Sequence, residues 1–490
     1  MADEQQTVAV VVAHGIGDQL PMDTVRALVD NVFGTDSGLK DPAPVYSRLH
    51  RGADFSDLRR LVLAKSGDRP RVDFHELYWQ ATFGVGSPGS VLGWALRLLR
   101  RRPVGKQFRH IVLTVRLVLC VLVVIALAVA WAALSWLDPE SWWGRVLSVA
   151  APLLVAAGTV AKLLVKNVLA SAVADASRWF SPGPGDIESR DKVRALGVDL
   201  LKELHRPGAD GKPRYGRIVV IAHSLGAVVT YDAIRLAFDE LREPTPLALP
   251  PRGPAERRQP HAWAFATAEP GEPPFLDASG QAVVRQLAGA AYHRLQTDLQ
   301  AEQRSMGVAW RVTDFITVGS PLTHAADLLS SKNVSFARRM RENELPGCPP
   351  LGEQQNRERA WAASRPRKAV QLAAGTKGTG RVAFYREQED GPLIAHEASP
   401  FATTRWTNLY FPMTRWLAGD PVGGPAADVF GRGVVDTEVE VSAPDKERRK
   451  VMRWPVRAHT WYWHRVDRGS GNADKDCIDQ LREAMELQWA

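Results

Sequence analysis

A serine with the local sequence of a nucleophile stands at residue 224, within IAHSLG (residues 221–226). The β-branched run at residues 218–221 predicts a short buried strand, and the small residues from 226 to 233 predict a helix. A serine hydroxyl attacks well only when a base removes its proton and the backbone presents it clear of other side chains. A sharp strand-to-helix turn presents it in this way, so Ser224 is the predicted nucleophile.

The turn departs from the G-x-S-x-G pattern at one position. Ala222 stands where the pattern has its first glycine, whereas Gly226 retains the second. Both positions must be small because the helix packs closely against the strand, and a methyl group can fit there. The helix N-terminus also offers free N–H groups and a partial positive charge to a developing oxyanion. The motif therefore favours acyl-transfer chemistry over a structural serine in a tight turn.

The rest of the chain supplies the elements that must position this turn. Strands are predicted at residues 7–12, 71–79, 218–221, 311–318 and 406–411, and helices at about 21–33, 186–205 and 281–303. The continuous apolar run of the first strand is typical of a parallel sheet that is covered on both faces. Strands and helices in succession predict an α/β fold. The segments 243–272 and 342–381 lack periodicity and predict exposed loops.

Two long apolar segments interrupt this pattern. Residues 117–137 carry no charge, and residues 146–165 carry only Lys162. Each is long enough to cross a hydrocarbon core of about 30 Å, and the tryptophans between them are typical of a membrane interface. The alternative is a pair of buried core helices or an apolar lid, which Arg116 and Lys162 favour.

Basic residues flank these segments on the side away from the connecting loop. By the positive-inside rule, a membrane hairpin would therefore have both ends in the cytoplasm. The bases are Arg97, Arg100, Arg101, Arg102, Lys106 and Arg109 before the first segment, and Lys166 and Arg178 after the second.

Composition narrows the class of protein. The chain has 490 residues, so we expect two domains or one enlarged domain. Its three cysteines, Cys120, Cys348 and Cys477, are far apart and odd in number, which indicates reduced thiols. The net charge of +8 accompanies no zinc-finger spacing or P-loop, so we expect no metal, no cofactor and no nucleic-acid partner. The N-terminus lacks the features of a signal peptide.

Four segments together resemble the lipase and esterase branch of the α/β-hydrolase superfamily. They are VVVAHGIGD (residues 10–18), the turn at Ser224, FITVGSPL (residues 315–322), and the pair DPV (residues 420–422) and HTWYW (residues 459–463). The resemblance implies a mostly parallel sheet flanked by helices, with the apolar segments as a two-helix insertion. It also implies a triad in the order Ser, acid, His, so the acid and base should follow residue 224.

The resemblance points to one base and one acid. His459 precedes a small residue and an aromatic pair, as in the family, whereas His464 follows the aromatics. Asp420 lies in a turn after a late strand, where the acid must orient the imidazole. Asp436 is the alternative acid, and His464 is the alternative base.

The family's oxyanion hole implies two backbone donors here. One is the N–H of Leu225, after the nucleophile, and the other is that of Ile16 in the first loop. His14, Gly15 and Gly17 form the supporting loop. A phosphate-binding glycine turn is the alternative, but a third glycine is absent.

These assignments divide the chain into segments. Residues 1–89 carry the oxyanion loop, 90–180 the apolar hairpin, 181–240 the nucleophile, 241–305 a Pro-rich insertion with a cap helix, and 306–490 the acid and base.

We expect a membrane-associated serine hydrolase that cleaves carboxylic esters, of lipids or other apolar esters, through an acyl-enzyme. It would lie at the cytoplasmic membrane with its catalytic domain facing the cytoplasm. A non-catalytic membrane scaffold and a membrane-damaging defence effector are the alternatives, and the oligomeric state stays open.

Overall fold

The computed structural model of the chain describes most of its residues. These are residues 7–16, 20–34, 44–49, 58–67, 69–82, 96, 99–100, 102–135, 176, 178–180, 184–245, 258–262, 289–330, 334–350, 353–354, 381–382, 384–385, 392–413, 418–465 and 476–487. The chain forms two compact units. The first comprises residues 1–82, 191–414 and 418–490, and the second comprises residues 83–190 and 415–417.

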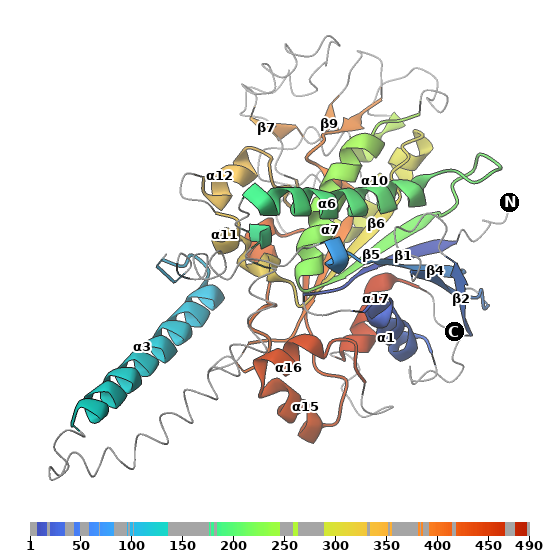
Figure 1. The fold of residues 1–490 in the computed structure, drawn as a ribbon. Coiled ribbons are helices and arrows are strands. Elements are labelled where there is room, and N and C mark those ends of the chain that lie inside the picture. Colours follow the sequence, from blue (N-terminus) through green and yellow to red (C-terminus); the bar gives the residue numbers. More distant parts are fainter. Residues whose placement is uncertain are drawn as a thin grey trace. The chain divides into compact units, whose positions relative to one another are not determined.

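An eight-stranded sheet forms the centre of the first unit (Figure 1). Its strands are β1 (Val8–Ala13), β2 (Val45–Leu49), β3 (Arg59–Leu63), β4 (Val72–Leu77), β5 (Arg217–His223), β6 (Val312–Val318), β11 (Arg405–Tyr410) and β12 (Val435–Glu438). They lie in the order β12, β11, β6, β5, β1, β4, β3, β2. The strands from β12 to β4 are parallel, and β3 and β2 continue the sheet antiparallel.

The central strands are buried on both faces. Every residue of β1, β4 and β6 is buried, and so is every residue of β5 after Arg217. Continuous apolar runs, which are typical of strands covered on both faces, occur in β1 and β5, whereas β4 and β6 also bury charged side chains such as Glu76 and Asp314. The predicted α/β architecture with a mostly parallel sheet is therefore confirmed.

Helices cover both faces of this sheet (Figure 1). On one face, α1 (Asp23–Val32) and α17 (Cys477–Met485) pack side by side, and their apolar side chains share one core with strand residues such as Val10 and Val219. On the other face lie α7 (Leu225–Leu241) and α10 (Ala290–Ser305). The helix α6 (Pro184–His205) packs so closely on α7 that a Cβ at Gly197 would lie 2.7 Å from that of Ala233.

Shorter elements complete the described part of the chain. They are η1 (Gln80–Thr82), η4 (Pro321–His324), α11 (Ala325–Leu328), α12 (Phe336–Arg341), β7 (Glu353–Gln354), β8 (Arg381–Val382), β9 (Phe384–Tyr385), β10 (Ile394–Ala395), η6 (Pro400–Ala402), α14 (Ala427–Phe430), α15 (Asp445–Met452) and α16 (Pro455–Thr460).

The five predicted strands occur within one or two residues of their expected bounds. The sequence pattern missed β2, β3 and β12, because β2 is mostly exposed and β12 is only half-buried at the sheet edge. The predicted helix 281–303 is observed as α10 only from Ala290, because Gly289 has a φ of 62° and precedes the helix. Residues 281–288 lie outside the described part. All three cysteines are free thiols, as predicted.

The second unit contains α3 (Lys106–Ser135). This helix covers most of the first apolar segment, whereas the second, residues 146–165, lies outside the described residues. Within the described residues, no helix combines the length and the apolar character that crossing a membrane requires.

Candidate active site

Ser224 occupies a strained turn between β5 and α7. Its φ of 53° and ψ of −130° are unusual for a residue with a side chain. The turn is held from both sides, because the N–H of Ser224 donates to the carbonyl of Val318 at 3.1 Å and the N–H of Ala227 donates to the carbonyl of Ser224 at 3.0 Å. Strain of this kind persists only where the surroundings enforce it, and it occurs most often at functional sites.

The small residues around Ser224 permit a close backbone approach. A Cβ at Gly226 would lie 2.4 Å from the carbonyl oxygen of His14, so no larger residue fits there. Ala222 is fully buried in β5 beside Ala13 of β1. The methyl group at position 222 is therefore accommodated, while position 226, two residues after the serine, demands glycine.

The three predicted catalytic side chains form one chain of hydrogen bonds. Ser224 Oγ lies 2.8 Å from Nε2 of His459, and Nδ1 of His459 lies 3.0 Å from each carboxylate oxygen of Asp420. They come from three places: the end of β5, the loop after β11, and α16. Asp420 is fully buried and the side chain of His459 is 13% exposed. This geometry suits a hydroxyl that passes its proton to an oriented imidazole.

Several groups keep Asp420 ionised. The hydroxyl of Tyr462 donates to Oδ2 at 2.7 Å, and the N–H of Val422 donates to Oδ1 at 2.8 Å. Burial alone would raise the pKa of Asp420, but the electrostatic interaction and hydrogen bond with His459, together with the hydrogen bonds from Tyr462 and Val422, outweigh it and lower that pKa. Tyr462 is part of the aromatic pair in HTWYW, and sequence reasoning had given it no role.

Glycines make room for the acid. Gly319 has a φ of 54°, and a Cβ there would lie 2.6 Å from the ring of Tyr462 and 2.9 Å from Oδ2 of Asp420. A Cβ at Gly423 would lie 2.8 Å from the same oxygen. The acid turn is also tied to η4, because Nε2 of His324 donates to the carbonyl of Pro421 at 2.9 Å.

His223 is a further member of the site that sequence reasoning left without a role. Its Nε2 lies 2.9 Å from the carbonyl oxygen of His459, and the two imidazole rings are 4.9 Å apart. Burial, followed by the influence of His459, lowers the pKa of His223 to about 3. The ring is therefore neutral near pH 7, and its Nε2–H holds the backbone of the base. Its place directly before the nucleophile was the available signal.

The first loop lies beside the nucleophile, as predicted. Ala13 of β1 pairs with Ala222 of β5, which brings His14 and Gly15 beside His223 and Ser224. A Cβ at Gly15 would lie 2.9 Å from that of Ser224.

Both predicted oxyanion donors lie in the described part. Leu225 is the first residue of α7, where an N–H has no acceptor within the helix. Ile16 is half-buried in the first loop, and Gly17 lies outside the described residues.

Trp79 holds His14 in place through a hydrogen bond and a stacking contact. Its indole N–H donates to the carbonyl of His14 at 3.1 Å, and the two rings stack with centroids 5.1 Å apart. Burial lowers the pKa of His14 to about 4, so this histidine is neutral near pH 7. Its Nδ1 donates to the carbonyl of Gly15 at 2.8 Å, and its ring lies against Tyr78 and Trp79, so this histidine shapes the loop.

The alternative acid and base lie apart from the chain of hydrogen bonds at Ser224. Asp436 accepts hydrogen bonds from the N–H groups of Ala426 and Ala427 and from Asn408, at 2.7–2.9 Å. His464 contacts the ring of Trp461 at a centroid distance of 4.9 Å. No cluster suited to hold a metal ion occurs among the described residues.

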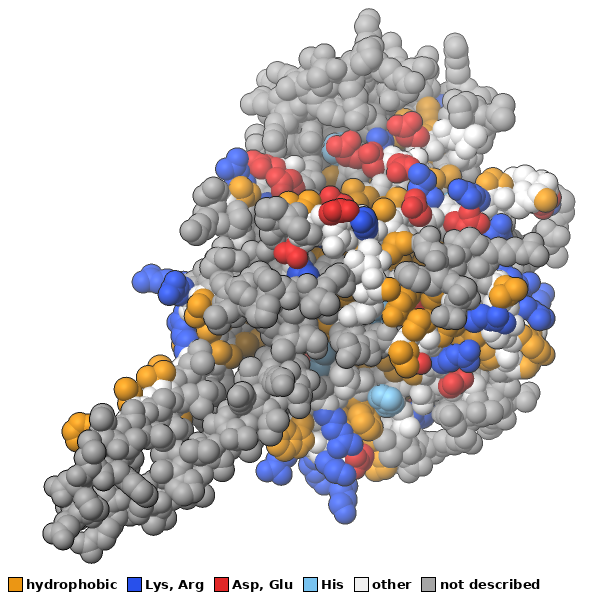
Figure 2. Space-filling view, in the orientation of Figure 1, with side chains coloured by type: hydrophobic (Ala, Val, Ile, Leu, Met, Phe, Trp, Pro, Cys, Tyr) orange, Lys and Arg blue, Asp and Glu red, His pale blue; other side chains and the backbone are white. Residues whose placement is uncertain are grey.

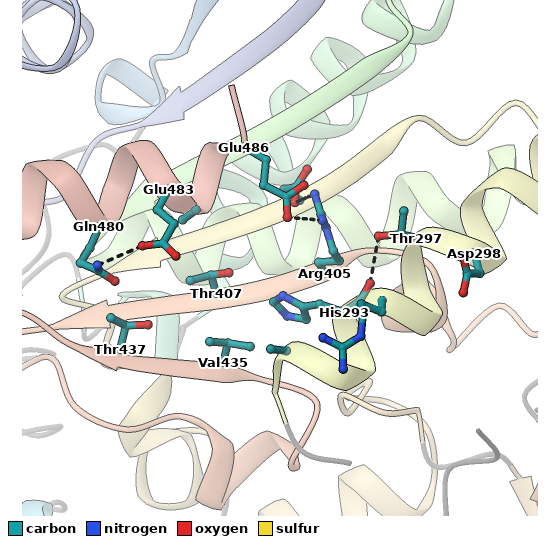
Figure 3. Close-up of a pocket in the computed structure, with 14 residues that line it drawn as sticks. His293, Thr297, Asp298, Arg405, Thr407, Val435, Thr437, Gln480, Glu483 and Glu486 are labelled. Atoms are coloured by element: carbon teal, nitrogen blue, oxygen red, sulfur yellow. Dashed lines mark hydrogen bonds and ion pairs between the residues drawn. The ribbon is translucent and has the colours of Figure 1, made fainter. Parts of the chain in front are cut away.

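A pocket of about 620 Å³ lies elsewhere in the first unit, between α10 and α17 (Figure 3). Arg405, in its wall, bridges Asp314 and Glu486, with nitrogen–oxygen distances of 2.6 Å to each. The pocket is at the amino ends of β11 and β12, whereas Ser224 follows the carboxyl end of β5. None of the predicted site residues lines it.

The site thus combines a buried serine in a strained turn, a base, a buried acid and a glycine loop. Comparison of the chain with protein-family models, curated proteins and solved structures finds no match. The chemical interpretation therefore depends on the geometry.

Proposed function

We propose that this chain is a serine hydrolase of the α/β-hydrolase type that cleaves carboxylic esters through an acyl-enzyme. The observation that carries the proposal is the continuous chain from Ser224 Oγ to His459 Nε2 and from His459 Nδ1 to Asp420. The strained turn at Ser224 supports it, because a merely structural serine needs neither a positive φ nor a paired imidazole.

Acylation begins at the hydroxyl of Ser224. Its oxygen attacks the ester carbonyl carbon as Nε2 of His459 takes the proton, and buried Asp420 stabilises the resulting imidazolium. Collapse of the tetrahedral intermediate breaks the bond to the leaving alcohol, which receives the proton from His459. Water then repeats the sequence on the acyl-enzyme and releases the acid.

The negative oxygen of the tetrahedral intermediate needs donors on the side of the first loop. We assign this role to the N–H groups of Leu225 and Ile16, and to His14, Gly15 and Gly17 the support of that loop. One such donor is worth about 3 kcal/mol of the barrier in comparable hydrolases.

Apolar and lipid esters are the proposed substrates, and the cytoplasmic face of a membrane is the proposed location. Support comes from the second unit, where α3 leaves apolar side chains exposed, among them Val124 at 64%, Leu127 at 64% and Trp131 at 67%. Exposed apolar area of this extent favours a lipid or protein contact over water. The basic residues before α3 favour the cytoplasmic side.

The test of the nucleophile is labelling with a fluorophosphonate, which reacts with activated serines. The wild-type protein should be labelled, and Ser224→Ala should not. Ser320→Ala is the matched control, because Ser320 is also buried, follows the neighbouring strand β6 and caps η4 rather than contacting a base. Labelling that persists in Ser224→Ala would exclude the proposed nucleophile.

Hydrolysis of nitrophenyl esters with short and long acyl chains tests the substrate class. We expect turnover that rises with acyl length and is lost in His459→Ala but kept in His464→Ala. Full activity of His459→Ala would move the base elsewhere, and a chain that hydrolyses no ester would favour the scaffold interpretation.

A further inference from the structure

Helix α15 carries a stripe of basic residues on its outer face. Lys446, Arg449, Lys450 and Arg453 are all exposed, and they recur at i, i+3, i+4 and i+7. Residues with this spacing lie on one side of a helix. On the opposite side, Val451 is fully buried in the core. Figure 2 shows Lys and Arg side chains gathered over this part of the first unit.

The stripe ends in a tryptophan. Trp454, at i+8, is 60% exposed and is the N-cap residue of α16, the helix that carries His459. A large aromatic side chain that gains little from burial in its own fold is an unusual surface residue. The proposed catalytic base, His459, lies in the same short helix that this tryptophan caps.

The nearby carboxylates do not neutralise the stripe. Glu447 pairs with Arg457 at 3.0 Å and with Lys450 at 3.5 Å, and Glu440 pairs with Arg448. Asp445 lies 3.6 Å from Arg448. Lys446, Arg449 and Arg453 have no ion pair within the described part of the chain, so three cations of the stripe face solvent uncompensated.

We propose that the stripe Lys446, Arg449, Lys450, Arg453 and Trp454 is a docking surface for an anionic lipid membrane. The cations face the phosphate groups of the lipid headgroups, and the indole settles at the headgroup level. The docked surface sets α16, with His459, at the bilayer from which an ester must enter. That docking brings the catalytic base to its substrate rests on the proposed function, whereas the docking itself does not.

A membrane is favoured over a nucleic acid by the arrangement of the groups. The cations form one straight helix face, which matches a flat array of phosphates, and the single aromatic residue stands at its end rather than among them. Single-stranded nucleic acids are bound by aromatic side chains interleaved with bases along a groove.

Flotation with vesicles tests the docking surface in the full-length Ser224→Ala protein, so that hydrolysis cannot alter the lipid. Vesicles of phosphatidylcholine alone are compared with vesicles that also contain phosphatidylglycerol. The anionic vesicles should bind more protein, and this excess should fall as salt shortens the Debye length from about 10 Å to about 3 Å. The ratio of protein bound to anionic vesicles over protein bound to phosphatidylcholine vesicles removes any contribution of α3 that does not depend on lipid charge.

The decisive variant replaces Lys446, Arg449 and Arg453 with Gln. All three are exposed and Gln is a good helix former, so the fold should persist. The preference for anionic vesicles should fall about a hundredfold, which corresponds to three cations at the surface. The matched control replaces Arg206, Lys212 and Arg214, which are exposed in the loop before β5, and should retain the preference.

Equal losses in the two triple variants would overturn the proposal, because binding would then depend on net charge alone. Loss of binding to an RNA homopolymer with no change in vesicle binding would also overturn it and point to a nucleic acid. Trp454→Ala should weaken binding to both kinds of vesicle.

Hydrolysis of a soluble short-chain ester separates this proposal from the proposed function. The stripe variant should hydrolyse the soluble ester like the wild type and lose activity only on vesicle substrate. If the wild type binds anionic vesicles but hydrolyses no ester, the docking surface stands and the hydrolase fails. If esters are hydrolysed without any preference for anionic vesicles, the docking surface fails alone.

Discussion

The hydroxyl of Tyr462 donates a hydrogen bond of 2.7 Å to Oδ2 of Asp420 and accepts one of 2.9 Å from the N–H of Phe411. Tyr462 and Asp420 are fully buried, and the ring of Tyr462 stacks on that of Phe411 with centroids 4.1 Å apart. One side chain therefore fixes the acid and closes the end of β11 at the same time.

Tyr462→Phe should raise the pKa of Asp420, because the carboxylate loses a donor. A carboxylate with a lowered pKa is ionised until the pH falls through that pKa, so the variant should lose activity at a higher pH than the wild type does. We expect kcat near neutral pH to fall about tenfold, since a hydrogen bond to a charged group is worth about 1.5–3 kcal/mol. The acid limb of the pH profile is the measurement.

The matched control for this change is Tyr292→Phe. Tyr292 is also fully buried and donates to the carbonyl of Phe401 at 2.8 Å. Its loss should lower stability and leave the acid limb unchanged. The same shift in both variants would contradict a specific role for Tyr462.

Asp420→Asn should reduce kcat by about 10⁴-fold, because an amide cannot hold His459 in the required tautomer or stabilise its charge. Asp436→Asn should retain activity and lose stability, since Asp436 accepts hydrogen bonds from Ala426 and Ala427. Steady-state kinetics and urea unfolding of the two variants check this. If kcat fell more in Asp436→Asn than in Asp420→Asn, Asp436 would be the catalytic acid and Asp420 a structural residue.

His223→Phe should lower kcat about tenfold with little change in KM. The phenyl ring still fills the space of the imidazole, but the hydrogen bond to the carbonyl of His459 is lost. His223→Gln should recover most of the loss, since its amide can donate in place of Nε2–H. Equal defects in the two variants would show that only the packing of the ring matters.

Gly226→Ala should destabilise the fold by about 3 kcal/mol or more, because the added methyl group would lie 2.4 Å from the carbonyl oxygen of His14. Ala222→Gly, at the matching position before the serine, should cost only about 1 kcal/mol. Thermal unfolding of the two variants compares them. Similar midpoints would argue against the close approach of α7 to the first loop.

Glu76, near the end of β4, should make stability depend on pH. It is buried, one oxygen accepts the N–H of Met22, and the other has no hydrogen-bond partner within the described residues. Burial raises its pKa from 4.5 to about 7. The folded state therefore binds the proton more tightly than the unfolded state, and stability should fall as the pH rises from about 4.5 through 7.

Glu76→Gln should remove this dependence and keep an acceptor for Met22. The unfolding free energy of the wild type relative to the variant should fall by about 3 kcal/mol between pH 4.5 and 8. Urea unfolding at the two pH values measures it. Parallel pH dependence in both proteins would contradict the raised pKa.

The sequence alone determined the local parts of this protein. Mostly apolar runs located β1, β5 and β6, because a strand buried on both faces carries few polar side chains. The small residues around position 224 indicated the turn, since only they let a helix start against a strand. Short, partly or mostly exposed strands such as β2 and β12 were not predicted, because their sequences show no hydrophobic periodicity.

Only the tertiary structure decided how the distant parts meet. Asp420 follows β11 and Asp436 lies within β12, and sequence reasoning kept both as candidate acids. The fold separates them: Asp420 reaches His459 across the ends of β6 and β11, whereas Asp436 is occupied by backbone N–H groups. The roles of Tyr462 and His223 likewise depend on contacts between segments far apart in the chain. Such contacts arise from sheet order and packing, which local spacing does not encode.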